Sequence, residues 1–215
     1  MDDKFKAKRE ELAKALIMQG ISDKNVLDAI RKIPRHLFVN PGDEGSAYFN
    51  IPLEIAKGQT ISQPYTIAVM LQALELKKGE KVLEIGTCSG YNAVLISELV
   101  GKDGFVYTTE IVPELINISK SNIAKLGIKN IEVIETDGSQ GWEKNSPYDK
   151  IIITAACPEI PKPVIGQLKP GGIVVAPVGP VFGQKMVKLT KLKKGLKEEN
   201  LGEFMFVPLK GKYGY

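Results

Sequence analysis

The sequence predicts one α/β domain: a doubly wound, mostly parallel sheet with N-terminal helices and a C-terminal antiparallel hairpin. Strand-length apolar runs alternate with helical patterns between residues 81 and 176, as in a parallel sheet covered on both faces. Two amphipathic patterns precede this region, and two strand-like runs without a helix between them follow it. The 215 residues suffice for one sizeable core but not for two.

Two helices are expected at the N-terminus. Apolar spacing predicts a helix over Phe5–Gln19, which Gly20 ends. A second helix spans Val26 to Ile33, with Ser22 or Asp23 as its cap and Pro34 as its stop.

A long segment rich in Pro and Gly, residues 35–62, is expected to be irregular. A connection of this length in a compact domain is usually functional. Pro64 suits the first turn of the next helix, with Ser62 or Gln63 near its cap. We therefore divide the single domain into residues 1–63, the N-terminal helices and active-site loop, and residues 64–215, the cofactor-binding core with the C-terminal strands.

The core elements follow from strict alternation along the chain. The closing hairpin is expected to turn at Lys194-Gly195. A parallel core with a terminal hairpin is the Rossmann-like pattern of class I methyltransferases. The expected strands are 81–85, 105–109, 131–134, 150–154, 172–176, 185–192 and 203–209, and the expected helices are 64–74, 91–100, 113–126 and 162–168.

Composition excludes several classes of protein. Charged residues make up 25% of the chain and the net charge is +4, an excess too small to indicate a nucleic-acid partner. The charged N-terminus has no apolar signal region, and no apolar run is long enough to cross a bilayer. We expect Cys88 and Cys157 to be reduced thiols in a cytoplasmic, monomeric protein without nucleic-acid or membrane partners.

The first candidate site is the loop Glu84–Gly90, EIGTCSG, which follows a strand and opens a helix. Ligands of doubly wound sheets bind at such strand ends. Gly86 permits a tight turn, and Gly90 permits a close approach of backbone or helix. The loop could instead be a dinucleotide fingerprint, but Cys88 occupies the position of its middle glycine. It could also be a plain connection that binds no ligand.

Two further candidates follow the next strands. Glu110, twenty positions after Gly90, can accept hydrogen bonds from both hydroxyls of a ribose. Asp137 can accept from an adenine amino group, and Gly138 leaves room for the ring. Alone, these residues also fit a helix-start carboxylate and an Asp-Gly turn. In series, the three segments predict an adenosyl pocket across successive strand ends.

Beyond these three segments, the sequence resembles the protein-L-isoaspartate O-methyltransferase family over almost the whole chain. The segment at 58–64 is the most family-specific, because ordinary class I methyltransferases lack it. The family usually has glycine at the position of Cys88 and alanine near Cys157, so these positions depart from its pattern. The matching segments are Pro34–Val39 (PRHLFV), Gly58–Pro64 (GQTISQP), Val82–Tyr91 (VLEIGTCSGY), Asp137-Gly138, Pro147–Asp149 with Ile151–Ala156, Gln167–Gly172 and Phe206–Leu209.

The resemblance implies methyl transfer from S-adenosyl-L-methionine to the free α-carboxylate of L-isoaspartyl residues, with D-aspartyl residues as a further candidate, in damaged proteins and peptides. The resulting ester collapses to a succinimide, which begins repair. The resemblance places Ser62 at the catalytic centre, with Thr60 and Ile61 beside it against the substrate. The implied cofactor contacts are Glu84, Gly86, Thr87, Ser89, Gly90, Glu110, Asp137 and Gly138.

This chemistry suits a chain with one histidine and no apparent metal cluster. A carboxylate, with a reference pKa of about 4, is already ionised at neutral pH and needs no general base. We therefore expect His36 to serve packing or hydrogen bonding. A dry pocket and alignment of the reactants would supply the rate.

Three different functions remain compatible with the sequence. The first is a nucleic-acid methyltransferase: residues 154–158 (TAACP) lack the acceptors that grip an amino group, although Cys157 could attack a pyrimidine. We expect Cys157 to be buried and inert instead. The second is a non-catalytic module that only holds S-adenosylmethionine, and the third is a methyltransferase of small carboxylic acids.

Overall fold

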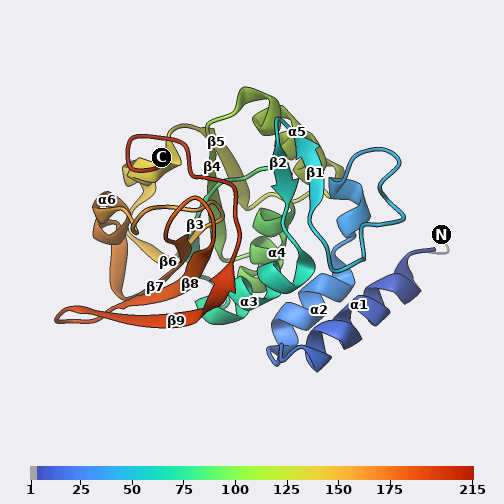
Figure 1. Cartoon of the computed structure of the whole chain (residues 1–215), viewed down its shortest axis with the longest axis horizontal. Helices are drawn as coiled ribbons and strands as arrows, with labels where there is room; N and C mark the ends of the chain where they lie inside the picture. The colour runs from blue at the N-terminus through green and yellow to red at the C-terminus, as the bar shows by residue number, and fades with distance from the viewer. Residues whose placement is uncertain (1–3) are drawn as a thin grey trace.

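The computed structural model describes residues 4–215 and has a seven-stranded sheet at its centre (Figure 1). The strand order is β5-β4-β3-β6-β7-β8-β9; the strands from β5 to β7 run parallel, and β8 and β9 are antiparallel to their neighbours. Chain order reverses beside β3, which lies between β4 and β6. The predicted fold class is confirmed. The strands are β3 Lys81–Ile85, β4 Phe105–Glu110, β5 Ile131–Glu135, β6 Tyr148–Ile153, β7 Leu168–Val178, β8 Gln184–Lys191 and β9 Leu196–Phe204.

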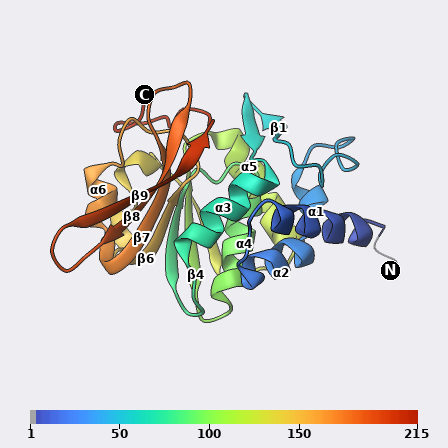
Figure 2. The same ribbon diagram turned by 60° about the horizontal axis from the view of Figure 1, so that its bottom comes forward.

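Helices of unequal length cover the two faces of the sheet (Figure 2). Side chains alternate along β3, so Val82 packs with α3 and α4 while Leu83 packs in a second cluster on the opposite face. The first face carries α3 Pro64–Leu74, α4 Tyr91–Val100 and α5 Pro113–Lys125; the second carries α6 Lys162–Gly166 and the 3₁₀ helices η2 Gly138–Gln140 and η3 Glu143–Asn145.

The two predicted N-terminal helices are α1 Lys6–Met18 and α2 Lys24–Lys32, and α2 packs against α3 and α4. Of the two possible caps, Asp23 is the one observed, because its carboxylate accepts hydrogen bonds from the backbone nitrogens of Asn25 (2.8 Å) and Val26 (3.2 Å). The first three residues of the charged N-terminus lie outside the described range.

The expectation of an irregular segment over residues 35–62 is wrong in part. It contains a 3₁₀ helix, η1 Arg35–Phe38, and a hairpin of β1 Leu53–Ala56 with β2 Gln59–Ile61. Lys57 and Gly58 form its turn with positive φ of 54° and 70°. Strands of four and three residues are too short to produce a recognisable period-2 pattern. An ion pair of 2.9 Å between Lys57 and Glu114 ties the hairpin tip to α5.

The last predicted strand, 203–209, is also misplaced. The turn at Lys194-Gly195 leads directly into β9, which is an exposed edge strand. Its polar sequence has no apolar alternation by which a strand could be recognised. The apolar residues 206–209 leave the sheet instead. Ala156 nitrogen donates to Val207 oxygen (2.8 Å), and Leu209 nitrogen donates to Ala156 oxygen (2.7 Å). These bonds hold the C-terminal segment beside the carboxyl end of β6.

Within residues 4–215, none of the helices combines the length and apolar character that crossing a bilayer requires.

Candidate functional site

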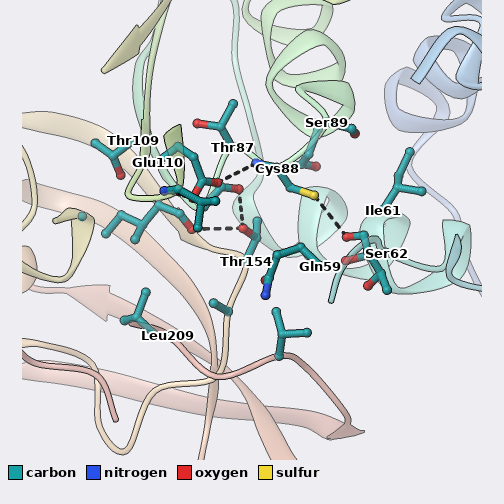
Figure 3. Close-up of a pocket in the computed structure, with 18 of the residues that line it drawn as sticks. Gln59, Ile61, Ser62, Thr87, Cys88, Ser89, Thr109, Glu110, Thr154 and Leu209 are labelled. Atoms are coloured by element: carbon teal, nitrogen blue, oxygen red, sulfur yellow. Dashed lines mark hydrogen bonds between the residues drawn. The ribbon is translucent and has the colours of Figure 1, made fainter. Parts of the chain in front are cut away.

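A pocket opens where chain order reverses in the sheet, at the carboxyl ends of β3, β4 and β6 (Figure 3). Thr109 and Glu110 stand on one side of it, Ile61 and Ser62 on the other, and Cys88 lies between them. The lining residues are Gln59–Ser62, Ile67, Met70, Ile85–Ser89, Tyr91, Asn92, Thr109–Val112, Gly138, Thr154, Ala155 and Val207–Lys210.

The Gly-rich loop after β3 is held in a tight turn. The backbone nitrogens of Gly86 and Thr87 donate to Thr109 oxygen at 2.9 and 3.1 Å. Gly86 has φ of 101°, and a Cβ there would collide with Thr154 Oγ1, so this position requires glycine. Cys88 takes a left-handed conformation with φ of 48°.

Glu110 organises that loop from the end of β4. Its Oε2 accepts from Cys88 nitrogen (3.0 Å), and its Oε1 accepts from the nitrogens of Ile111 (2.9 Å) and Val112 (3.0 Å). A carboxylate offers about four acceptor positions, so about one remains for a ligand. Glu110 is 7% exposed and lines the pocket.

Glu84 lies behind the pocket wall. It is fully buried and accepts from Thr108 Oγ1 (2.6 Å) and Asn92 Nδ2 (2.7 Å). Burial raises the pKa of Glu84 to about 7, against the effect of these two hydrogen bonds. Thr87 Oγ1 joins the same network through Thr108 Oγ1 (2.6 Å). Glu84 therefore supports Thr87 and Asn92, which do line the pocket.

Asp137 is directed toward the C-terminal segment. Its Oδ1 accepts from the nitrogen (3.0 Å) and hydroxyl (2.6 Å) of Ser139, and its Oδ2 accepts from Lys212 nitrogen (2.9 Å). Burial opposes ionisation, but these bonds outweigh it and lower the pKa of Asp137. Gly138 lines the pocket, and a Cβ there would lie 2.8 Å from Ile85 Cγ2. The room predicted at Gly138 is thus occupied in part by protein side chains.

The remaining predicted loop residues flank α4. Ser89 is 2% exposed, lines the pocket and accepts from Asn122 Nδ2 through its carbonyl oxygen (3.1 Å). Gly90 caps α4 with φ of 85°. A Cβ on Gly90 would lie 3.3 Å from both Ile123 and Ser119, so this glycine serves the close packing of α4 on α5 and is not among the lining residues.

The β1–β2 hairpin brings Thr60, Ile61 and Ser62 to the opposite wall. Cys88 Sγ lies 3.5 Å from Thr60 oxygen and bridges the two walls. Gln63 is the N-cap of α3, so a helix-cap role for Ser62 is wrong. Ser62 also borders a neighbouring groove lined by Tyr65, Phe204 and further residues of α3 and β9, which leads from the pocket toward the sheet edge.

His36 and Cys157 do not line the pocket, whereas Cys88 lies in its wall. His36 Nδ1 pairs with Tyr48 Oη (2.7 Å), and its ring centroid lies 4.2 Å from that of Phe5, which confirms the expected packing role. Burial raises the pKa of both thiols, Cys88 and Cys157, to about 12, and Cys157 is fully buried. Among residues 4–215, no group of three His, Cys, Asp or Glu side chains could hold a metal ion.

Several residues that line the pocket are not predicted from the sequence. Ile111 and Val112 line the pocket directly after Glu110, and two apolar residues beside the expected ribose acceptor are a signal that could have found them. Thr154 has its hydroxyl 3.0 Å from Ile85 oxygen and 2.7 Å from Gly86 oxygen. The pocket wall includes Val207–Lys210 because the C-terminal segment leaves the sheet. No local sequence pattern predicts this departure.

Comparisons with known proteins agree with one another. The family model described as protein-L-isoaspartate(D-aspartate) O-methyltransferase matches residues 7–214. The chain is 47% identical to protein-L-isoaspartate O-methyltransferase 2 of Archaeoglobus fulgidus, over 98% of this chain and 96% of that protein. It is 48% identical to protein-L-isoaspartate O-methyltransferase of Methanoculleus marisnigri, over 99% and 96%.

Solved structures give the same result. A protein-L-isoaspartate O-methyltransferase superposes with a TM-score of 0.86 and 32% identity, covering 95% of this chain and 67% of that chain. A putative protein-L-isoaspartate O-methyltransferase of Plasmodium falciparum, in complex with S-adenosyl-L-homocysteine, has a TM-score of 0.82 and 26% identity over 94% of this chain and 98% of that one.

Proposed function

This chain belongs to the protein-L-isoaspartate(D-aspartate) O-methyltransferase family, and we propose that it methylates damaged proteins in the pocket at the carboxyl ends of β3 and β4. As a family member it is an S-adenosylmethionine-dependent enzyme that acts on isoaspartyl residues and initiates their repair. The observation that carries the assignment of the site is the juxtaposition of Glu110, the Gly-rich loop and Ser62 around one pocket.

The residues present fit an adenosyl cofactor. Glu110 retains acceptor capacity toward the pocket, and the apolar pair Ile111 and Val112 follows it on the same wall. Gly86, where a Cβ would meet Thr154, lets the loop after β3 turn close against Thr154 at the wall of the pocket. We assign the ribose to Glu110 and the adenine to Ile111, Val112 and Gly138. Gly86, Thr87 and Ser89 hold the amino-acid end.

Three predicted contacts take different roles in this proposal. Glu84 acts through Thr108 and Asn92, because it is fully buried behind the wall. Asp137 acts through the C-terminal segment, because Ser139 and Lys212 already donate to its carboxylate. Gly90 positions α4. These residues are supports of the cofactor wall.

Bound S-adenosylmethionine would supply a methyl group on a positively charged sulfur. The substrate α-carboxylate, already ionised, would accept that methyl group on one oxygen. One C–O bond would form as one C–S bond breaks, S-adenosylhomocysteine would leave, and no proton would move. Ser62 orients the carboxylate by donating a hydrogen bond, and Thr60 and Ile61 lie against the substrate. The groove beside Ser62, toward α3 and β9, receives the flanking peptide. Alignment of this kind can contribute roughly 7–11 kcal/mol.

The product is a methyl ester, whose methoxy group leaves far more readily than an oxygen of the free carboxylate. Attack by the adjacent backbone nitrogen expels methanol and closes a succinimide. Hydrolysis of the succinimide then returns part of the material to normal aspartate. Neither step requires a residue of this chain.

The test is methyl transfer from labelled S-adenosylmethionine to two synthetic peptides that differ only at one aspartate, linked normally or through its side chain. We expect base-labile label on the isoaspartyl peptide alone. Label on neither peptide, with S-adenosylhomocysteine binding intact, would contradict the proposal. A D-aspartyl peptide in the same assay decides whether that residue is also accepted.

We further propose that the protein works as a cytoplasmic monomer without nucleic-acid or membrane partners. Support comes from two free cysteines and a net charge of only +4, which gives little electrostatic attraction for polyanions. Light scattering after gel filtration tests the monomer, and fractionation of the source cells tests the compartment.

A further inference from the structure

Arg35 is a fully buried cation in η1. Its Nε donates to Ala47 oxygen (2.8 Å) and its Nη2 to Ser62 oxygen (2.9 Å). Its Nη1 is buried and has no hydrogen-bond partner among the described residues. The guanidinium carbon lies 5.2 Å from the ring centroid of Tyr91.

No carboxylate pairs with Arg35 in the described part of the chain; its two acceptors are backbone carbonyls. Burying a charge without a counter-ion is costly, and a neutral side chain of similar length would fill this space at less cost. Burial lowers the pKa of Arg35 to about 10, so the group stays charged at neutral pH. The unneutralised charge is thus available to an anion nearby.

Arg35 lies behind the part of the pocket that is proposed to receive the substrate carboxylate. Ser62 and Tyr91, which Arg35 contacts, both line the pocket. The guanidinium holds the backbone of Ser62 from behind, while the Ser62 hydroxyl is proposed to meet the substrate carboxylate. Glu110, the acidic group of the pocket, lies on the opposite wall (Figure 3).

We propose that Arg35 is a positioning and affinity-determining residue for the substrate carboxylate. It fixes Ser62 through a hydrogen bond to the carbonyl oxygen of that residue. Its unpaired positive charge attracts the substrate carboxylate from behind Ser62. This inference rests on the proposed function, because it requires an anionic substrate at Ser62. It concerns substrate rather than cofactor, because the hydrogen bond that Arg35 makes at the pocket goes to Ser62, the residue proposed to meet the substrate carboxylate.

The two contributions act on different kinetic constants. Attraction of a carboxylate is strongest before its charge is neutralised by methylation, so the charge favours binding and lowers KM. Orientation of Ser62 aligns the reacting atoms and raises kcat. Arg35→Met removes both contributions, whereas Arg35→Lys keeps a cation and loses the two-pronged anchor.

The experiment measures steady-state kinetics with the isoaspartyl peptide and calorimetric affinity for S-adenosylhomocysteine. For Arg35→Met we expect KM to rise about tenfold or more and kcat to fall severalfold, with cofactor affinity within threefold of the wild type. For Arg35→Lys we expect kcat to fall severalfold and KM to rise less than in Arg35→Met. If Arg35→Met fails to fold, the fall in kcat of Arg35→Lys carries the test.

Arg9→Met is the matched control. Arg9 is also buried, and its Nε donates to Arg31 oxygen (2.6 Å); neither Arg9 nor Arg31 lines the pocket. We expect this variant to lose thermal stability while KM stays unchanged. Unchanged KM in folded Arg35→Met and unchanged kcat in Arg35→Lys would overturn the inference. Equal losses of peptide and cofactor affinity would overturn it too, by assigning the charge to the cofactor. Inactivity of the wild type toward the peptide would instead refute the proposed function.

Discussion

Replacing Glu110 by glutamine tests the proposed ribose contact and the loop support together. The substitution keeps the shape of the side chain but turns one acceptor oxygen into an NH₂ donor. Three backbone nitrogens, of Cys88, Ile111 and Val112, point at the two oxygens. Glutamine can present its oxygen to one group of donors only, so its NH₂ must face an N–H on the other side.

These contacts set the expected losses in stability and in cofactor affinity. Loss of one hydrogen bond to a charged group costs about 1.5–3 kcal/mol, and the bond from Cys88 exists without ligand, so this loss should appear in the free energy of unfolding. We assign the remaining acceptor position to the ribose. Its loss should weaken S-adenosylhomocysteine binding by a further 1.5–3 kcal/mol or so, roughly 10–150-fold in Kd.

Urea unfolding and titration calorimetry separate the two losses. Glu114→Gln is the control, because Glu114 lies four residues after Glu110 in the first turn of α5 but is exposed and pairs only with Lys57 among the described residues. Both quantities should stay near wild type. The 2′-deoxy and 3′-deoxy analogues of S-adenosylhomocysteine complete a double cycle. Wild type should lose affinity for at least one analogue, and Glu110→Gln should lose less. If the variant discriminates as strongly as the wild type, Glu110 does not hold the ribose.

Three further results are expected. Ser62→Ala should lower kcat at least tenfold while S-adenosylhomocysteine affinity changes less than threefold; equal losses would remove its catalytic assignment. Gly211→Val should weaken cofactor binding severalfold, because a Cβ at Gly211 would collide with Asp137 and displace the C-terminal segment; unchanged affinity would show that the segment does not close the pocket. The pKa of Glu84, raised from 4.5 to about 7 by burial, means that the folded protein holds this proton more tightly than the unfolded chain. Its contribution to stability is therefore greatest below pH 4.5, falls by about 3 kcal/mol as the pH rises to 7, and is level above. Glu84→Gln should remove that slope in urea unfolding at pH 5 and pH 8, and identical slopes would contradict the assignment.

Most of the fold could be predicted because its signals are local. The helix at 91–100 and the strand at 81–85 have the bounds that periodicity predicts, since apolar spacing and flanking glycines act over a few residues. The edge strand β9 could not be found this way. It has a neighbour on one side only and its polar residues leave no alternation, while the apolar residues 206–209 resemble a strand without being one.

The residues of the candidate site also fall into those that local sequence patterns predict and those that they do not. Glu110 and the loop around Gly86 follow strands, so their place at the pocket could be predicted. The burial of Glu84 could also have been predicted, because period 2 puts Glu84 and Val82 on the face covered by α4, whereas the family motif alone indicates a direct cofactor contact. Asp137 is different, because its partner Lys212 is 75 positions away in sequence, and only the folded chain brings them together.

The charges around the pocket fit a reaction between a cation and an anion. Glu110 lies on the wall assigned to the cofactor, and Arg35 lies behind the wall assigned to the carboxylate. In our proposal Glu110 holds the ribose of the cofactor, and the charge of Arg35 attracts the carboxylate until methylation neutralises it. These residues should therefore act mainly on Kd and KM. Since the proposed reaction needs no base or metal ion, we expect kcat to depend on how closely Ser62 and the Gly-rich loop align the two reactants, and therefore on the geometry of the β1–β2 wall.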